Sequence, residues 1–279
     1  MKRHGFTLVE MLTVLAIITI LVGLLVPSLT MVRRVAKETK QKAMLASIEV
    51  AITAFRNDHG DYPPSWYDVD APENEGYGGG QKLTEALLGR DLLGFHPLSQ
   101  FDLADGVYDG TPENLATRRS SYLEATSLTA VSVGSLYARV FGPSFPLHPD
   151  SILICDVFGR EKVSMPDGTL VKAGAPVLYY KANPNSRIYN GVAPAEDRIY
   201  DMWDNIDIIG AQFALTLQQQ PLQQLDFFYG NPPTIPFGYI QDPTVTAMQW
   251  PHRPDSYLLV TAGYDGIYGT ADDITNFGP

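Results

Sequence analysis

The chain has 279 residues, a net charge of −11 and a single cysteine, Cys155, which excludes an intrachain disulfide. Residues 1–59 carry eight Lys/Arg against four Asp/Glu, whereas residues 60–279 carry 12 against 27. The acidic part, roughly 220 residues, is long enough for one sizeable core. Its charge makes nucleic acid an unexpected partner and suits divalent cations.

The first apolar run, residues 6–29, predicts a segment that inserts into a membrane. As a helix its 24 residues would reach about 36 Å, enough to cross a bilayer core of about 30 Å. Lys2 and Arg3 form a short basic leader before it, and Glu10 is the single acid inside it. A charged side chain in hydrocarbon is costly and usually marks a partner or a pathway.

The order of residues around this acid resembles the prepilin signature of type IV pilins and type II secretion pseudopilins. The matching residues are Gly5, Phe6, Thr7, Leu8, Val9 and Glu10. The resemblance implies that a prepilin peptidase cuts between Gly5 and Phe6 and methylates the new Phe6 amine. It also implies that Glu10 neutralises the Phe6 amine of a neighbouring subunit during assembly, and a cationic amine would relieve a carboxylate in lipid. Pro27 fits too, because pilin helices often carry a late proline.

An ordinary secretory signal or signal anchor is the alternative interpretation. A secretory signal has an apolar core of 7–15 residues and an A-x-A-like cleavage site, which this run lacks, and an anchor has no need of Glu10. The processing motif implies a single-pass inner-membrane protein with a cytoplasmic N-terminus and a periplasmic head. Five basic residues after the run favour the opposite orientation by the positive-inside rule: Arg33, Arg34, Lys37, Lys40 and Lys42.

Residues 30–59 predict an amphipathic continuation of the same helix. Apolar residues recur on one face, at Met44, Ile48, Ala51, Ile52 and Phe55. Gly60 and the Pro63-Pro64 pair supply the stop. The chain thus divides into a leader (1–5), a membrane or filament-core helix (6–29), its continuation (30–59) and a head (60–279). Residues 54–63 are similar to the A-x-R-x-D-x-G-x-Y-P segment with which pseudopilins leave this helix.

The head predicts a small antiparallel sheet, so that the fold class is α+β and pilin-like. The expected strands are Ser151–Cys155, Pro176–Lys181 and Ser256–Thr261, with Cys155 a buried strand residue. Residues 65–150 and 183–250 read as irregular insertions with short helices near Lys82–Leu88 and Asp204–Leu217. The tetrapeptide Asp156–Gly159 is similar to the D-P-W-G turn of pseudopilins, with Val and Phe in the middle positions.

The C-terminal segment 259–277 places three carboxylates and three glycines within eleven residues. Calcium prefers six to eight oxygen ligands, and glycines let a loop fold around it. The segment looks like the calcium loop that ends major pseudopilins, with Phe277 in place of the usual Trp. On that resemblance Asp265 and Asp273 are the expected ligands and Asp272 a possible third. A solvated acidic turn is the alternative.

Other acids and histidines form weaker patterns. One group could form another calcium turn but lacks the spacing of an EF-hand: Asp102, Asp105 and Asp109. A second group has the spacing of one solvent-exposed helical face: Asp201, Asp204 and Asp207. The five histidines are scattered, with no H-E-x-x-H, and no G-x-S-x-G elbow is present. The glycine run 78–80 lacks the G-K-[ST] of a phosphate loop. The sequence therefore does not predict an enzyme.

The sequence favours a structural subunit, a pseudopilin that polymerises into a fibre of a type II secretion system after cleavage and methylation. The expected partners are the prepilin peptidase, copies of the chain, other pseudopilins and the inner-membrane assembly platform. A type IV pilin for adhesion, motility or DNA uptake is the second hypothesis. A membrane-anchored binding module or enzyme that uses the prepilin route is the third, with its groove in the two insertions.

Overall fold

The computed structural model describes residues 7–66, 76–142, 145–165, 168–189, 191, 193–194, 197–231 and 237–278. The chain divides into two compact units, residues 1–40 and 41–279, each described by itself. The helices are α1 (Leu8–His59), α2 (Gly79–Leu88), η1 (Leu103–Asp105), α3 (Pro112–Thr117), η2 (Ala125–Ser127), α4 (Val133–Leu136), η4 (Met202–Asn205), α5 (Ile206–Thr216), η5 (Pro221–Gln223) and α6 (Leu225–Tyr229). The strands are β1 (Thr129–Ser132), β2 (Ile152–Cys155), β3 (Glu161–Ser164), β4 (Leu170–Ala173), β5 (Leu178–Lys181), β6 (Tyr257–Thr261) and β7 (Ile274–Thr275).

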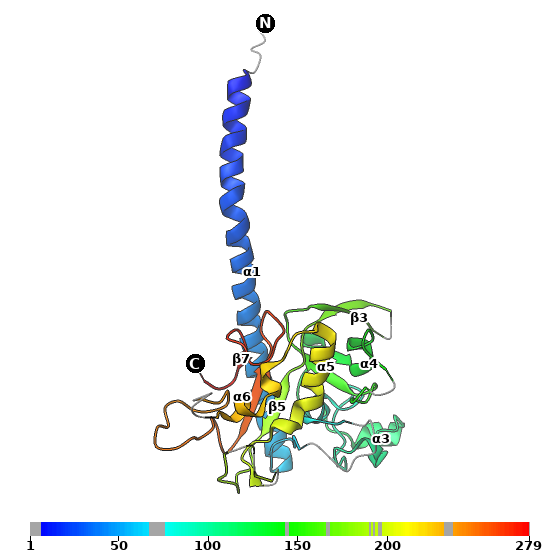
Figure 1. Cartoon of the computed structure of the whole chain (residues 1–279). Coiled ribbons are helices and arrows are strands. Elements are labelled where there is room, and N and C mark those ends of the chain that lie inside the picture. The colour runs from blue at the N-terminus through cyan, green and yellow to red at the C-terminus, as the bar shows by residue number, and fades with distance from the viewer. Residues whose placement is uncertain are drawn as a thin grey trace. The chain divides into compact units, whose positions relative to one another are not determined.

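The predicted single long helix is confirmed as α1, the blue helix of Figure 1, which has 52 residues. Its last turn ends at a left-handed glycine: Gly60 has φ +85° and donates its N–H to Arg56 O at 2.7 Å. The chain then runs to Pro63, whose carbonyl accepts from the Tyr179 hydroxyl at 2.7 Å. The expected face of α1 is buried, at Met44, Ile48, Ala51, Ile52 and Phe55. Gln41 and Leu45, which were not part of the expected face, are buried as well.

A three-stranded antiparallel sheet, β5-β6-β7, forms the centre of the head and confirms two of the expected strands. Side chains alternate between two apolar clusters, because successive strand residues point to opposite faces. Tyr179 and Leu259 pack with the second half of α1 and with α2, whereas Tyr180 and Leu258 pack with α5 and α6. Both faces of the sheet are therefore covered.

Two further hairpin-like pairs complete the sheet structure, β1-β2 and β3-β4, both antiparallel. The third expected strand is β2, and Cys155 at its end is fully buried, which raises the pKa of its thiol. Its partner β1 lies within the region 65–150 that we expected to be irregular, so that expectation is wrong there. The strands β1, β3 and β4 are each four residues long with mixed polarity, too short for a period to be read from the sequence.

The helix α2 begins at Gly79, three residues before Lys82, where the sequence predicted its start. The glycines at 78–80 allow the backbone at this helix start to approach the backbone of neighbouring segments closely. A Cβ on Gly79 would lie 2.0 Å from Tyr179 O, and one on Gly78 would lie 2.3 Å from Asp204 O. Asn205 closes the contact, since its Oδ1 accepts from Gly80 N and its Nδ2 donates to Tyr179 O, both at 2.8 Å. Packing of the α2 start on β5 therefore accounts for this run.

Asp156, in the turn after β2, is a buried hydrogen-bond centre. Its Oδ1 accepts from Phe158 N at 2.9 Å, and its Oδ2 accepts from Ala175 N at 3.1 Å and from Arg160 Nη2 at 2.9 Å. Burial raises the pKa of Asp156 although Arg160 opposes this shift. Arg160 Nη1 also donates to Gly263 O at 2.9 Å, so the turn is tied to the C-terminal loop.

Candidate functional site

The start of α1 is organised by a reciprocal pair of hydrogen bonds between Thr7 and Glu10. Glu10 Oε2 accepts from Thr7 N at 2.8 Å and from Thr7 Oγ1 at 2.7 Å, and Glu10 N donates to Thr7 Oγ1 at 3.2 Å. This is a capping box, which satisfies amides that a helix start leaves without partners. The T-x-x-E spacing of Thr7 and Glu10 is the sequence signal for this box, in addition to the subunit pairing expected for Glu10. Gly5 and Phe6, the predicted cleavage pair, lie outside the described residues.

Among the described residues, one helix, α1, contains a stretch that is long enough and apolar enough to cross a membrane, judged by length and composition. Its hydroxyls bond to carbonyls of the preceding turn: Thr13 to Glu10 O, Thr19 to Leu15 O and Ser28 to Leu24 O. Such local bonds leave no hydroxyl donor facing hydrocarbon. Pro27 lies inside the helix without ending it.

The C-terminal loop brings Asp265 and Asp272 together. Thr270 Oγ1 lies 3.1 Å from Asp265 Oδ2 and 2.7 Å from Asp272 Oδ1, so it bridges the two carboxylates. Burial and the neighbouring Asp272 charge raise the pKa of Asp265. Burial acts the same way on Asp272, but hydrogen bonds from Thr270 and from the Asp265 and Tyr264 amides outweigh it and lower the pKa of Asp272.

Asp273 points elsewhere. Its Oδ2 accepts from the Tyr239 hydroxyl at 2.5 Å and from Gly269 N at 2.7 Å. Its Oδ1 is buried without a hydrogen-bond partner among the described residues. Burial raises the pKa of Asp273 to about 7. The two acids that the sequence paired, Asp265 and Asp273, therefore have different hydrogen-bond partners in the structure.

The donor set of the loop fits a calcium ion in its chemistry. Asp265, Asp272 and Thr270 present oxygen atoms, the ligands that calcium prefers. The expected carbonyls of the 259–263 region already accept other bonds, for example Gly263 O from Arg160, although a carbonyl keeps a second lone pair. Within the described ranges, no three His, Cys, Asp or Glu side chains are placed to hold a metal together.

Comparison with known proteins matches the N-terminus to one family model, the prokaryotic N-terminal methylation motif, over residues 1–26. The competence protein ComGC of Bacillus subtilis is 36% identical over 77 residues, which cover 28% of this chain and 76% of that protein. The ComGC of Halalkalibacterium halodurans is 37% identical over 75 residues, 27% of this chain and 71% of that protein. The chain belongs to the type IV pilin-like proteins that carry a prepilin-type N-terminus.

No solved structure matches this pilin-like protein. Each alignment covers little more than a quarter of the chain, so most of the head lies outside the matched regions. The anchor and the assembly motif therefore come with the family, whereas the properties of the head must be argued from its own residues.

The weaker acidic clusters of this pilin-like protein have structural roles. Asp105 pairs with Arg90 at 2.9 Å, and Asp109 Oδ1 accepts from Thr111 N at 2.9 Å. Asp201 accepts from Trp203 N at the start of η4. The expectation that Asp204 lies on a solvent-exposed helical face is wrong, because Asp204 is only 4% exposed. Its carboxylate accepts a hydrogen bond from the buried Ser65 hydroxyl, and η4 packs against α2.

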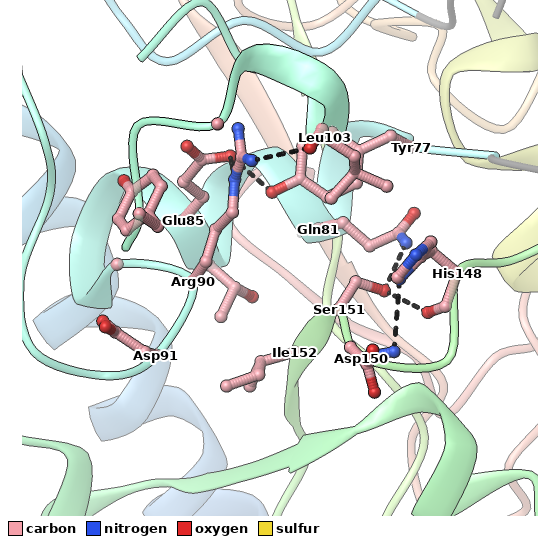
Figure 2. A pocket seen from close by; sticks show the side chains of 14 residues that line it. Tyr77, Gln81, Glu85, Arg90, Asp91, Leu103, His148, Asp150, Ser151 and Ile152 are labelled. Atoms are coloured by element: carbon pink, nitrogen blue, oxygen red, sulfur yellow. Dashed lines mark hydrogen bonds and ion pairs between the residues drawn. The ribbon is translucent and has the colours of Figure 1, made fainter. Parts of the chain in front are cut away.

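A cavity of about 280 Å³ lies beside α2 in the head (Figure 2). On one wall the Arg90 guanidinium lies 3.2 Å from a Glu85 carboxylate oxygen, and Glu85 also accepts from the Tyr77 hydroxyl at 2.5 Å. One turn earlier on α2, Gln81 Nε2 donates to Ser151 Oγ at 2.7 Å. Arg90 Nε is buried without a hydrogen-bond partner among the described residues, but it keeps its ion pair with Glu85. The other polar groups bond to one another, and we interpret the cavity as part of the packing between α2 and its neighbours.

Proposed function

We propose that this pilin-like protein is a structural, non-catalytic subunit that polymerises through α1 into a fibre of a type II secretion system. The observation that carries the proposal is the build of α1: a capped start with an acid, an apolar membrane-length stretch, and a second half whose apolar face is buried in the head. Such a helix can be anchored in a membrane or in a fibre core while the head stays folded.

Glu10 has two candidate roles, helix capping and charge pairing, and different substitutions can distinguish them. In the single subunit its carboxylate caps α1 through Thr7. In the proposed fibre it also takes the cationic Phe6 amine of a neighbouring subunit, which would offset the cost of a carboxylate in an apolar surrounding. Gln can still serve the cap, because capping boxes use Glu or Gln at this position, but it carries no charge.

The test compares Glu10→Gln with Glu10→Ala in cells, by quantifying sheared or crosslinked fibres. If charge pairing drives assembly, both variants lose fibres by about tenfold or more, since a difference of 1.4 kcal/mol is tenfold. A result in which Glu10→Gln assembles normally and only Glu10→Ala fails would leave Glu10 a capping residue. Membrane fractions should contain both variants in wild-type amounts.

Processing and orientation are part of the same proposal. The mature protein should begin with N-methyl-Phe6, as read by mass spectrometry, and protease added to intact spheroplasts should digest the head, because the head is expected on the periplasmic side of the membrane. An intact Met1, or a cut near Ser28, in cells that contain the peptidase would reject the processing. The basic residues after the membrane stretch make the orientation test informative, because they favour the opposite topology.

A competence pilus is the second candidate, favoured by the relatives named competence protein ComGC. The charge of the head favours secretion over direct contact with DNA, because residues 60–279 carry 12 basic against 27 acidic residues. A deletion strain distinguishes the two: loss of secreted proteins with normal transformation supports the secretion fibre. The reverse pattern, loss of transformation with normal secretion, would assign the chain to DNA uptake.

We also propose a structural calcium ion at the C-terminal loop. The arrangement of the acids supports Asp265 and Asp272 as its main donors, with Thr270 between them. The buried Asp273, predicted as a ligand from the sequence, instead holds Tyr239 and Gly269. Bound calcium would supply positive charge that offsets repulsion between neighbouring carboxylates, and so order the loop.

A further inference from the structure

A second cleft in the head, of about 530 Å³, lies where the chain leaves α1 and passes the end of β5. Its walls come from three segments distant in sequence: 61–66, 181–185 and 198–204. The volume falls in the range of small-molecule sites, and the lining mixes an exposed tryptophan with amides and charged side chains. Nothing in the fibre function requires such a cleft.

Trp66 is one of the residues that line this cleft. One face of its indole is occupied, because the ammonium of Lys82 lies 4.4 Å from the ring centroid and donates to Trp66 O at 2.5 Å. Lys82 is only 1% exposed, whereas Trp66 is 55% exposed. The cation therefore fixes the ring from behind, and the open face is a rigid apolar platform.

The charged groups around the platform are already paired. Lys181 Nζ lies 2.5 Å from Asp61 Oδ2, and Arg198 Nη1 lies 2.8 Å from Asp201 Oδ1. A charged ligand would have to compete with these pairs, whereas a neutral one can use their remaining donor and acceptor capacity. Asn185 adds an exposed side-chain amide that makes no hydrogen bond within the described part of the chain.

From this combination we infer that the cleft binds a neutral oligosaccharide, with one sugar ring stacked on Trp66. A pyranose ring has an apolar face for an indole and hydroxyls at its edge for amide and carboxylate groups. An acidic polymer is disfavoured, since residues 60–279 are strongly acidic. The head would thus attach the fibre subunit to uncharged glycan of the cell envelope or of another cell.

The test uses the full chain in lipid nanodiscs, which avoids sugar-based detergents. Binding is measured by calorimetry to four neutral hexasaccharides, built of β-linked glucose, α-linked glucose, N-acetylglucosamine and mannose. A proline-rich peptide and an oligothymidylate are measured beside them. We expect at least one hexasaccharide to bind with Kd below about 1 mM, and neither the peptide nor the oligonucleotide to bind.

The variants assign the binding to this cleft. Trp66→Ala should weaken it by about tenfold or more, Trp66→Phe should restore most of it, and Asn185→Ala should weaken it by about threefold. Phe237→Ala removes another exposed aromatic, 62% exposed and outside the cleft lining, and should leave Kd unchanged. If Trp66→Ala fails to fold, the loss of binding in Asn185→Ala decides.

Three outcomes would overturn the inference. In the first, wild-type protein binds none of the four hexasaccharides. In the second, Trp66→Ala and Asn185→Ala bind as tightly as wild type. In the third, the peptide or the oligonucleotide binds and its binding is lost in Trp66→Ala, which would give the cleft a ligand of another class.

Discussion

The N-terminal unit, residues 1–40, and the second unit, residues 41–279, which contains the head and the end of α1, are organised by contacts of different range. In the first, hydrogen bonds join residues three or four apart, such as Thr7 with Glu10 and Ser28 with Leu24, and the apolar side chains stay exposed. In the head, Asn205 bonds to Gly80 and Tyr179, which are 125 and 26 residues away. The apolar side chains of the first unit are therefore exposed, whereas those of the second unit form apolar clusters with one another.

This difference predicts two kinds of mutant. Substitutions in the N-terminal unit should change anchoring or assembly and leave the unfolding free energy of the head unchanged. Substitutions at long-range contacts of the head should lower that free energy directly. The predictions below test this division, from the largest expected effect to the smallest.

Asp156→Ala should destabilise the head most, by about 3–5 kcal/mol, because it removes the acceptor of two amides and leaves Arg160 without its buried partner. Urea unfolding of the detergent-solubilised chain measures it. The control is Asp150→Ala, an exposed acid at the edge of the cavity in Figure 2, which should stay within about 0.5 kcal/mol. Equal midpoints for the two variants would contradict the central role given to Asp156.

Gly79→Ala should cost about 3 kcal/mol, since its methyl group would lie 2.0 Å from Tyr179 O and backbone cannot move aside as a side chain can. The matched control is Gly210→Ala, inside α5, whose Cβ would meet only Gln223 Nε2, at 3.5 Å. There alanine should raise stability by up to about 1 kcal/mol. Changes of the same sign in both variants would refute the close packing of α2 on β5.

The same division explains what the sequence could predict. The order of residues 5–10, the 3.6-residue period of 44–55 and the β-branched and aromatic strands are local signals, and they led to α1, β2, β5 and β6. The capping box of Thr7 and Glu10 also has a local signal, the T-x-x-E spacing, whereas the sequence interpretation assigned Glu10 to subunit pairing alone. Asp204 looked exposed by spacing, yet contacts with Ser65 and the start of α2 bury it. The platform at Trp66 depends on Lys82, and nothing in their spacing indicates that contact.

Calcium should stabilise the head by about 2.7 kcal/mol at a hundredfold excess over Kd, because a ligand that binds only the folded state shifts the equilibrium by mass action. A higher melting temperature in millimolar calcium, reversed by chelator, is the expected result. Asp272→Asn should remove most of the response, and Asp109→Asn, in an exposed turn, should keep it. If Asp273→Asn removes the response while Asp272→Asn does not, the sequence-based pairing of Asp265 with Asp273 is the better description.

The smallest effects come from two glutamates on α1, one in each unit. Glu38 pairs with Arg34 one turn away at 2.8 Å, and the two side chains are 35% and 49% exposed, so Glu38→Ala should change stability by less than about 0.5 kcal/mol. Glu49 instead accepts from Arg253 at 2.7 Å and from Asn276 at 3.0 Å, more than 200 residues away. Glu49→Ala should therefore cost about 1–2 kcal/mol in the same urea titration. The two variants share helix, residue type and substitution, so the range of the contact is what separates them. Equal changes in the unfolding free energy for the two variants would contradict the division of α1 between the two units.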